Sequence, residues 1–193
     1  MIILVGKTCS GKSSVAEILR TRYGYERIVT YTTRPPRENE RNGVEYHFIS
    51  QEEFERLKSE DFFFETTSYD VASGETWYYG TPKYALKNGS CIVMNPEGMK
   101  KVKKMLDPDA YDIKVIYLNT SEAMIWNRLR QRGDSSDEAS RRIDSDALDF
   151  ESIDNYYDVA ITTDSHNPEE IASIINAVIY TYWYMTNTTI MDT

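Results

Sequence analysis

Gly6-Lys7-Thr8-Cys9-Ser10-Gly11-Lys12-Ser13 fits the phosphate-binding pattern GxxxxGK(S/T), and it is the strongest signal in this chain. The apolar run 2–5 comes directly before it, and from Lys12 on apolar residues recur at helical spacing. A buried strand, a glycine loop and a helix start, in this order, turn backbone N–H groups and the positive end of a helix dipole toward a phosphate. The sequence therefore predicts a nucleotide-phosphate site near the start of the chain.

Two residues of this loop have predicted roles of their own. Lys12 is expected to reach the β and γ phosphates, and Ser13 is expected to ligate Mg²⁺. Lys7 and Cys9 stand at positions that vary freely in the pattern, so neither side chain is given a separate role. A glycine-rich turn without a ligand is the alternative, which the flanking strand and helix disfavour. The predicted phosphate site is the whole segment: Gly6, Lys7, Thr8, Cys9, Ser10, Gly11, Lys12, Ser13 and Ser14.

Length and composition narrow the class of protein. The 193 residues suit one domain, and 22 basic against 31 acidic residues give a net charge of −9, which repels nucleic acid and anionic membranes. We therefore expect neither as a partner. Two cysteines and two histidines provide no disulfide framework and no metal-ligand spacing. Because the first core strand begins at Ile2, leaving no room for a signal peptide, and no apolar run is long enough to span a membrane, we expect a cytoplasmic protein.

Short apolar runs alternate with amphipathic helical stretches along most of the chain. This alternation predicts an α/β fold with a parallel sheet covered by helices on both faces. The expected strands are 2–5, 91–94, 113–118 and 159–162, and the expected helices are 12–23, 97–105, 121–131 and 168–184.

Two segments depart from this alternation. Residues 30–80 are rich in Thr, Tyr, Phe and turn residues, with strand-like pieces at 44–48, 62–67 and 76–79, which predicts a small inserted β-rich subdomain. Residues 132–142 are polar and carry a glycine near their start, which predicts a mobile flap that leads into a helix.

A second group of residues adds chemistry to the inserted segment. Arg34 and Arg37 lie close together on a stretch stiffened by Pro35 and Pro36. Two arginines held by a rigid turn can grip one phosphate, because the guanidinium fork makes permanently charged, bidentate bonds to phosphate oxygens. On these residues alone, a pair of solvated surface arginines is the simpler interpretation.

The wider context of these arginines resembles the guanylate kinase family. Thr-Thr-Arg-x-Pro-Arg, followed by Glu, Gly and Tyr-x-Phe, is similar to that family's nucleotide-monophosphate motif and stands at the usual distance after the phosphate loop. The resemblance runs through about residue 165 and includes, in the family's order and spacing, 64–65, 78–81, 128–133 and 141–143. It implies a P-loop NTPase-type core (1–29 and 82–193), an inserted monophosphate-binding subdomain (30–81) and a short lid (about 130–145).

The resemblance also implies roles for individual residues. ATP would be the donor nucleotide on the phosphate loop, with Mg²⁺. Arg34, Arg37, Tyr46 and Tyr79 would hold the phosphate of the acceptor, and Thr30, Glu65, Thr81 and Asn95 would contact its base. A carboxylate such as Glu65 can accept hydrogen bonds from the N1–H and the exocyclic amine of guanine. Charge on the transferring group would be neutralised by Lys12, Arg34, Arg128, Arg132 and Arg142.

The chain departs from the family pattern at the end of the strand at 91–94. The family carries two aspartates there, separated by one residue, where this chain has Val93 and Asn95. Asn95 still offers a carbonyl to the base. Val93 removes the carboxylate nearest the position of a Walker B acid, which predicts weakened support for Mg²⁺ and a reduced rate.

These residues predict ATP-dependent phosphoryl transfer to GMP or dGMP, giving GDP or dGDP and ADP, by a monomer or a homodimer. One alternative is a nucleoside monophosphate kinase of different base preference, which Val93, Asn95 and the aromatic stretch 77–79 favour. Another is a guanylate-kinase-like module that binds phosphopeptides with weak or no activity. The intact phosphate loop disfavours that module.

Overall fold

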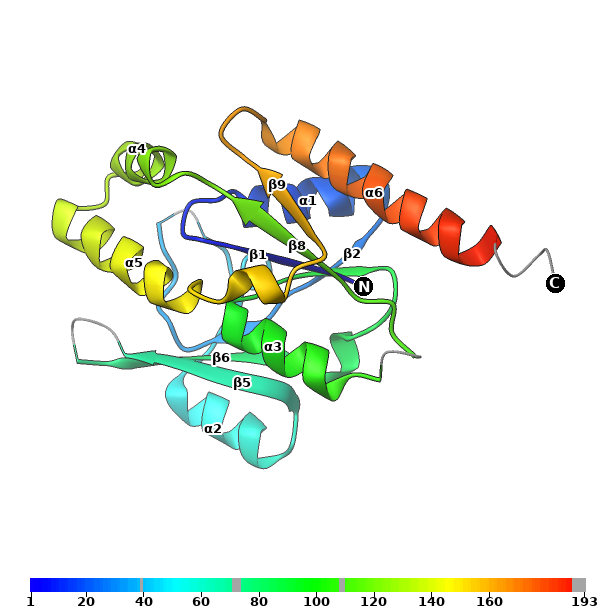
Figure 1. Ribbon diagram of the computed structural model, residues 1–193. Coiled ribbons are helices and arrows are strands. Elements are labelled where there is room, and N and C mark those ends of the chain that lie inside the picture. Colours follow the sequence, from blue (N-terminus) through cyan, green and yellow to red (C-terminus); the bar gives the residue numbers. More distant parts are fainter. Residues whose placement is uncertain (39, 71–73, 108–109, 189–193) are drawn as a thin grey trace.

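Five parallel strands form the centre of the computed structural model, which describes all residues except 39, 71–73, 108–109 and 189–193 (Figure 1). The strand order across this sheet is β2-β7-β1-β8-β9. The strands are β1 (Ile2–Gly6), β2 (Glu26–Ile28), β7 (Ser90–Val93), β8 (Lys114–Asn119) and β9 (Val159–Thr162). Every neighbouring pair runs parallel, so the carboxyl ends of all five strands meet at one edge. The predicted parallel sheet is confirmed, with β2 as a strand that was not predicted.

Helices cover both faces of this sheet, because the strands are apolar on both sides. On β1, Ile2 and Leu4 pack against one set of helices, and Ile3 and Val5 face the other way. Figure 1 shows α1 and α6 above the sheet and α3 below it. The helices are α1 (Lys12–Tyr23), α3 (Pro96–Met105), α4 (Glu122–Arg132), α5 (Ser136–Asp149) and α6 (Pro168–Thr188), with short 3₁₀ turns η1 (Lys83–Ala85) and η2 (Ile153–Asn155).

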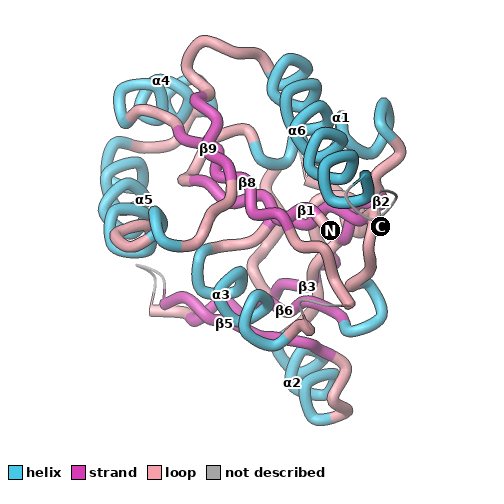
Figure 2. Tube along the Cα trace, turned by 45° about the vertical axis from the view of Figure 1, so that its right-hand side comes forward, coloured by secondary structure: helices cyan, strands magenta, loops and turns pink. Residues whose placement is uncertain are grey.

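A second, smaller sheet lies beyond α3 (Figure 2). Its strand order is β4-β3-β6-β5. The strands are β3 (Tyr31–Thr32), β4 (His47–Phe48), β5 (Phe63–Asp70) and β6 (Thr76–Pro82). The pair β5 and β6 is antiparallel, and Lys101 on α3 donates a hydrogen bond to the backbone oxygen of Thr66 at 2.8 Å. The strand-like pieces predicted for residues 30–80 are thus confirmed, and α3 connects this sheet to the larger one.

The smaller sheet carries a helix that was not predicted, α2 (Gln51–Ser59). Its apolar face consists of Phe54 and Leu57, which pack on Phe63 of β5. Ser50 caps the helix by accepting a hydrogen bond from the N–H of Glu53 at 3.2 Å. Ser50 and Glu53 have the spacing of a capping box, so the signal was present although the apolar stripe is only two residues wide.

The predicted flap at 132–142 is helical for most of its length. Gly133 ends α4 in a left-handed conformation (φ 86°), and α5 begins at Ser136, capped by Ser135. Within α5 only Ala139 is buried, which explains why its polar sequence reads as a loop. The connection between α4 and α5 is therefore short, and the arginines of this region lie on helices.

Candidate functional site

The phosphate loop joins β1 to α1, and its conformation requires its glycines. A Cβ on Gly6 would lie 2.5 Å from Ser10 Oγ and 2.9 Å from the backbone oxygen of Leu118. Gly11 caps α1 in a left-handed conformation with φ 91°, which favours glycine. The loop consequently folds tightly at the carboxyl end of the central strand, directly ahead of a helix N-terminus.

Lys12 folds back over this loop. Its Nζ donates hydrogen bonds to the backbone oxygens of Gly6 and Lys7 at 2.6 and 2.7 Å, and lies 3.2 Å from Ser10 Oγ. Desolvation lowers the pKa of Lys12 from 10.5 to about 8, and the nearby charge of Asp146 opposes that shift. The ammonium group is therefore held at the mouth of the loop, where a phosphate would meet it.

A cavity of about 750 Å³ lies between this loop, the smaller sheet and α5. Every residue predicted for the site lines this cavity except Lys7, whose backbone oxygen accepts a hydrogen bond from Lys12. Residues from five separate stretches of sequence, 6–14, 30–46, 65–81, 95 and 128–142, thus meet around one space. Its volume is ample for ligands of nucleotide size.

Arg34 is the buried cation of this cavity, with 5% of its surface exposed. Its Nη2 donates to both carboxylate oxygens of Glu40, at 2.9 and 2.8 Å, and its guanidinium lies over the rings of Tyr46 and Phe48. Hydrogen bonds from the Arg37 backbone and from Arg34 hold the pKa of Glu40 below 4.5, although burial opposes them. Glu40 was not predicted, and it fixes the orientation of Arg34.

Arg37 extends this positive region. Desolvation lowers the pKa of Arg37, and the like charges of Arg34, Arg142 and Arg132 lower it further. Arg34 follows β3, whereas Arg132 and Arg142 lie on α4 and α5, so folding brings these cations together. An anion bound among them would relieve this repulsion.

Two tyrosines border the arginines. Burial raises the pKa of Tyr46 to about 12, and its ring makes an edge contact with Tyr79 at a centroid distance of 5.9 Å. The Tyr46 hydroxyl therefore stays protonated at neutral pH and can donate a hydrogen bond.

Glu65 lies deeper in the same cavity. Its Oε1 accepts a hydrogen bond from Thr81 Oγ1 at 2.6 Å. Its Oε2 is buried and has no hydrogen-bond partner among the described residues. Burial raises the pKa of Glu65 above 4.5. A buried carboxylate oxygen without a donor is costly unless a ligand supplies one.

Asn95 lies beside Glu65 and caps α3. Its Oδ1 accepts from the N–H of Gly98 at 2.6 Å, and its Nδ2 lies 3.2 Å from Thr67 Oγ1. A Cβ on Gly98 would lie 3.4 Å from Glu65 Oε2, so the glycine keeps the space beside that oxygen open. Thr30 also lines the cavity.

The predicted arginines of the flap have distinct partners. Arg128 donates to the backbone oxygens of Cys9 and Thr163 at 2.9 and 3.2 Å, which ties the phosphate loop to the end of β9. Arg132 is paired with Asp134, which also lies 3.9 Å from Arg142. Arg128 therefore supports the loop, whereas Arg132 and Arg142 share one carboxylate at the edge of the cavity.

Glu138 on α5 makes a second such bridge. It accepts hydrogen bonds from Arg141 and Arg142, with the shortest at 2.6 Å from Arg142 Nε. The bond from Arg141 and the charge of both arginines lower the pKa of Glu138 to about 2. Glu138 therefore orients Arg142 and was not predicted.

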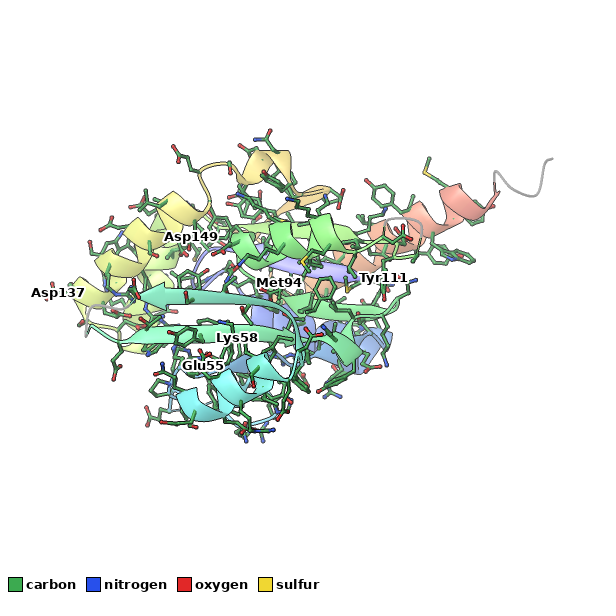
Figure 3. All side chains as sticks on the ribbon, turned by 90° about the horizontal axis from the view of Figure 1, so that it is seen from below. Glu55, Lys58, Met94, Tyr111, Asp137 and Asp149 are labelled. Carbon is green, nitrogen blue, oxygen red and sulfur yellow. The ribbon has the colours of Figure 1, made fainter. Side chains whose placement is uncertain are left out.

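One further carboxylate reaches the loop from α5. Asp146 Oδ2 accepts a hydrogen bond from the N–H of Thr8 at 2.6 Å. Burial raises the pKa of Asp146, and Lys12 and Lys7 oppose that shift. Asp149, labelled in Figure 3, comes from the C-terminal end of the same helix and also lines the cavity.

Comparisons with known proteins agree with this geometry. The family model described as guanylate kinase matches residues 1–181. The guanylate kinase of Nostoc sp. is 33% identical over 172 residues, which cover 85% of this chain and 82% of the relative. That of Prochlorococcus marinus is 30% identical over 188 residues, covering 94% and 97%. This chain belongs to the guanylate kinase family.

A solved structure supports the same fold. The guanylate kinase of Anaplasma phagocytophilum aligns with a TM-score of 0.69 at 22% identity, covering 94% of this chain and 85% of that one. The predicted P-loop NTPase-type fold is confirmed.

Among the described residues, no helix is long and apolar enough to cross a membrane, and no cluster of three or more His, Cys, Asp or Glu side chains could hold a metal ion.

The departure from the guanylate kinase pattern at β7 is visible in the structure. Val93 pairs with Leu4 of β1, next to the phosphate loop, and lines the cavity as an apolar side chain. The carboxylate that touches the loop comes from Asp146 instead. Sequence reasoning missed Asp146 because it lies in a polar helix with four other acidic residues, and only the fold distinguishes it from them.

Proposed function

We propose that this protein transfers the γ-phosphoryl group of ATP to GMP or dGMP, giving GDP or dGDP and ADP. The observation that carries the proposal is the unpartnered Oε2 of Glu65 in the cavity that also contains the phosphate loop. Guanine presents an N1–H and an exocyclic amine to such an acceptor, whereas the adenine edge has an acceptor at N1. A phosphate donor and a guanine acceptor therefore fit the same space.

The donor half of the site is the loop Gly6–Ser14. Its backbone N–H groups and the start of α1 would hold the phosphates of ATP, with Lys12 at the β and γ phosphates. We propose that Mg²⁺ is held by Ser13, whose hydroxyl lies exposed on the first turn of α1 and lines the cavity. Hydroxyl, phosphate and water oxygens are the ligands that this ion prefers, and when bound it would offset charge between the β and γ phosphates.

The acceptor half is divided between its phosphate and its base. Arg34, held by Glu40, and Arg37 would bind the phosphate with Tyr46 and Tyr79. Thr30, Glu65, Thr81 and Asn95 would contact the base.

We propose that the chain is one domain with a core at 1–29 and 82–193, an acceptor-binding subdomain at 30–81 and a lid at about 130–145.

The chemistry requires alignment of two anions more than proton removal. The acceptor phosphate is largely ionised near neutral pH, so no general base is needed. Lys12, Arg34, Arg132 and Arg142 would neutralise the charge that the two phosphates bring together. Arg128 would act through the loop that it supports. Closure of the lid and of the acceptor-binding subdomain would exclude water, which competes as an acceptor.

A kinase of different base preference is the alternative, which is not favoured, because the relatives that are 30 to 33% identical over most of the chain are guanylate kinases. A coupled assay of ADP release with GMP, dGMP, AMP, UMP and TMP decides between them. We expect GMP or dGMP to be turned over fastest and Lys12→Ala to abolish the signal. Faster turnover of AMP, UMP or TMP would refute the guanine assignment. Absence of ADP release with every monophosphate would favour a binding module.

We propose the cytoplasm as the compartment.

A further inference from the structure

Asp146 places a carboxylate against a backbone N–H group of the phosphate loop. Its Oδ2 lies 2.6 Å from the N–H of Thr8, a donor of the phosphate loop, and the residue lines the cavity. The loop offers its N–H groups to anions, so this carboxylate satisfies one of the groups that would otherwise face phosphate. The position belongs to α5, far in sequence from the loop.

The strand that borders the loop brings no negative charge to the same place. Val93 is the last residue of β7 and pairs with Leu4, two residues before the loop begins at Gly6. Asn95 is engaged in capping α3. Of these three residues, Asp146 alone carries a charge, and Lys12 is the cation that interacts with it most strongly. Asp146 in turn stabilises the Lys12 ammonium group.

A fixed negative charge at this point discriminates between two forms of the donor nucleotide. Metal-free ATP would bring its uncompensated phosphate charge next to Asp146, which repels it. ATP with a bound divalent cation carries less negative charge there, and the cation itself is attracted by the carboxylate, directly or through its water. Ser13 and Asp146 both line the cavity, and hydroxyl and carboxylate oxygens are the ligand chemistry of Mg²⁺.

We propose that Asp146 makes the phosphate loop selective for metal-bound ATP over metal-free ATP, replacing from α5 the carboxylate that β7 lacks. The inference rests on the proposed function, because it assumes ATP as the donor. It assigns a specificity role to a residue that the established pattern of the phosphate loop does not include. It also gives α5 a direct contact with the donor site, in addition to its arginines.

Binding of ATP measured by calorimetry in excess EDTA and in excess Mg²⁺, without acceptor, tests this role. For the wild-type protein we expect Mg²⁺ to tighten binding by about tenfold or more. In Asp146→Asn the amide oxygen can still accept from Thr8, so the loop keeps its hydrogen bond while the charge is lost. We expect this variant to bind metal-free ATP about tenfold more tightly than wild type and to lose most of the Mg²⁺ effect.

Three further variants make the result specific. Asp146→Ala, a second neutral variant, should behave as Asp146→Asn does, and Asp146→Glu should keep the preference for Mg²⁺. Asp144→Asn removes the same charge from an exposed position on the same helix and should match wild type. A wild-type Mg²⁺ effect in both neutral variants would overturn the proposal and leave the proposed function intact. No binding of ATP by wild type in either condition would overturn both.

Discussion

Thr81 Oγ1 donates a hydrogen bond to Glu65 Oε1 at 2.6 Å, and this bond fixes the carboxylate while leaving Oε2 without a partner among the described residues. The two residues are neighbours on the paired strands β5 and β6. One oxygen is therefore used for orientation, and the other is available to a ligand. This division makes Glu65 the position at which base preference is most open to test.

Glu65→Gln should lower kcat/KM for GMP by roughly 100-fold, because a neutral amide replaces a charged acceptor whose hydrogen bonds contribute about 3 kcal/mol. Steady-state kinetics with GMP and AMP measure the change, and KM for ATP should stay constant. Glu97→Gln, which removes an exposed carboxylate on the adjacent helix α3, is the matched control and should leave kcat/KM for GMP within about twofold. An equal loss in both variants would show that the effect is general electrostatics.

The extent to which sequence predicts this site depends on how local each signal is. The loop at 6–13 and the arginine pair lie in short continuous motifs, so their residues were found, and all but Lys7 line the cavity. Glu40, Asp134, Glu138 and Asp146 were missed. Asp146 contacts the N–H of Thr8, which only the folded chain brings within reach. The other three contact arginines two to six residues away in sequence. Acidic residues are frequent in this chain, so their partners cannot be chosen from sequence alone.

The same distinction applies to the fold. Strands β1, β7, β8 and β9 of the larger sheet are largely apolar runs, which is the pattern of strands buried on both faces, and they were predicted to within a few residues. Strand β2 has the sequence Glu-Arg-Ile, which carries no such signal, and it was missed. Helix α2 was missed, and α5 was predicted only as the helix into which a flap leads. Both bury few side chains and are stabilised at their N-termini by Ser50 and Ser135. Capping signals of this kind are weak in sequence, because a serine three residues before a glutamate is common.

Lys12 should give ATP binding a dependence on alkaline pH. Its pKa lies at about 8 in the free protein, so the fraction carrying a charge falls as pH rises through 8. A phosphate binds the charged form more tightly, and the dissociation constant for ATP should therefore increase above about pH 8, by up to tenfold per pH unit. Calorimetric titrations between pH 7 and 9.5 measure this. GMP binding serves as an internal control, and a constant affinity for ATP across that range would contradict the prediction.

Glu138 should contribute to stability in a defined window of acid pH. Its pKa is lowered from 4.5 to about 2, chiefly by the hydrogen bond from Arg141, so the folded state favours the ionised form. This contribution is complete above about pH 4.5 and is lost as pH falls toward 2. Urea unfolding of wild type and Glu138→Gln should differ at pH 7 and converge in acid. Glu55→Gln, at an exposed position of α2 labelled in Figure 3, should follow wild type throughout. A difference that persists undiminished at pH 2 would assign the effect to packing.

Arg128→Lys should weaken ATP binding by about tenfold while leaving GMP binding unchanged. The guanidinium fork reaches two backbone oxygens at once, those of Cys9 in the loop and Thr163 after β9, and a lysine has a single ammonium group for both. Losing one such bond costs about 1–2 kcal/mol, which is roughly tenfold in affinity when the loop must be ordered again on binding. Arg130→Lys, on the exposed side of the same helix, is the matched control. Separate titrations with ATP and GMP distinguish the outcomes: an equal loss for both nucleotides would place Arg128 in general folding, and an unchanged affinity for ATP would show that the two carbonyl contacts do not position the loop.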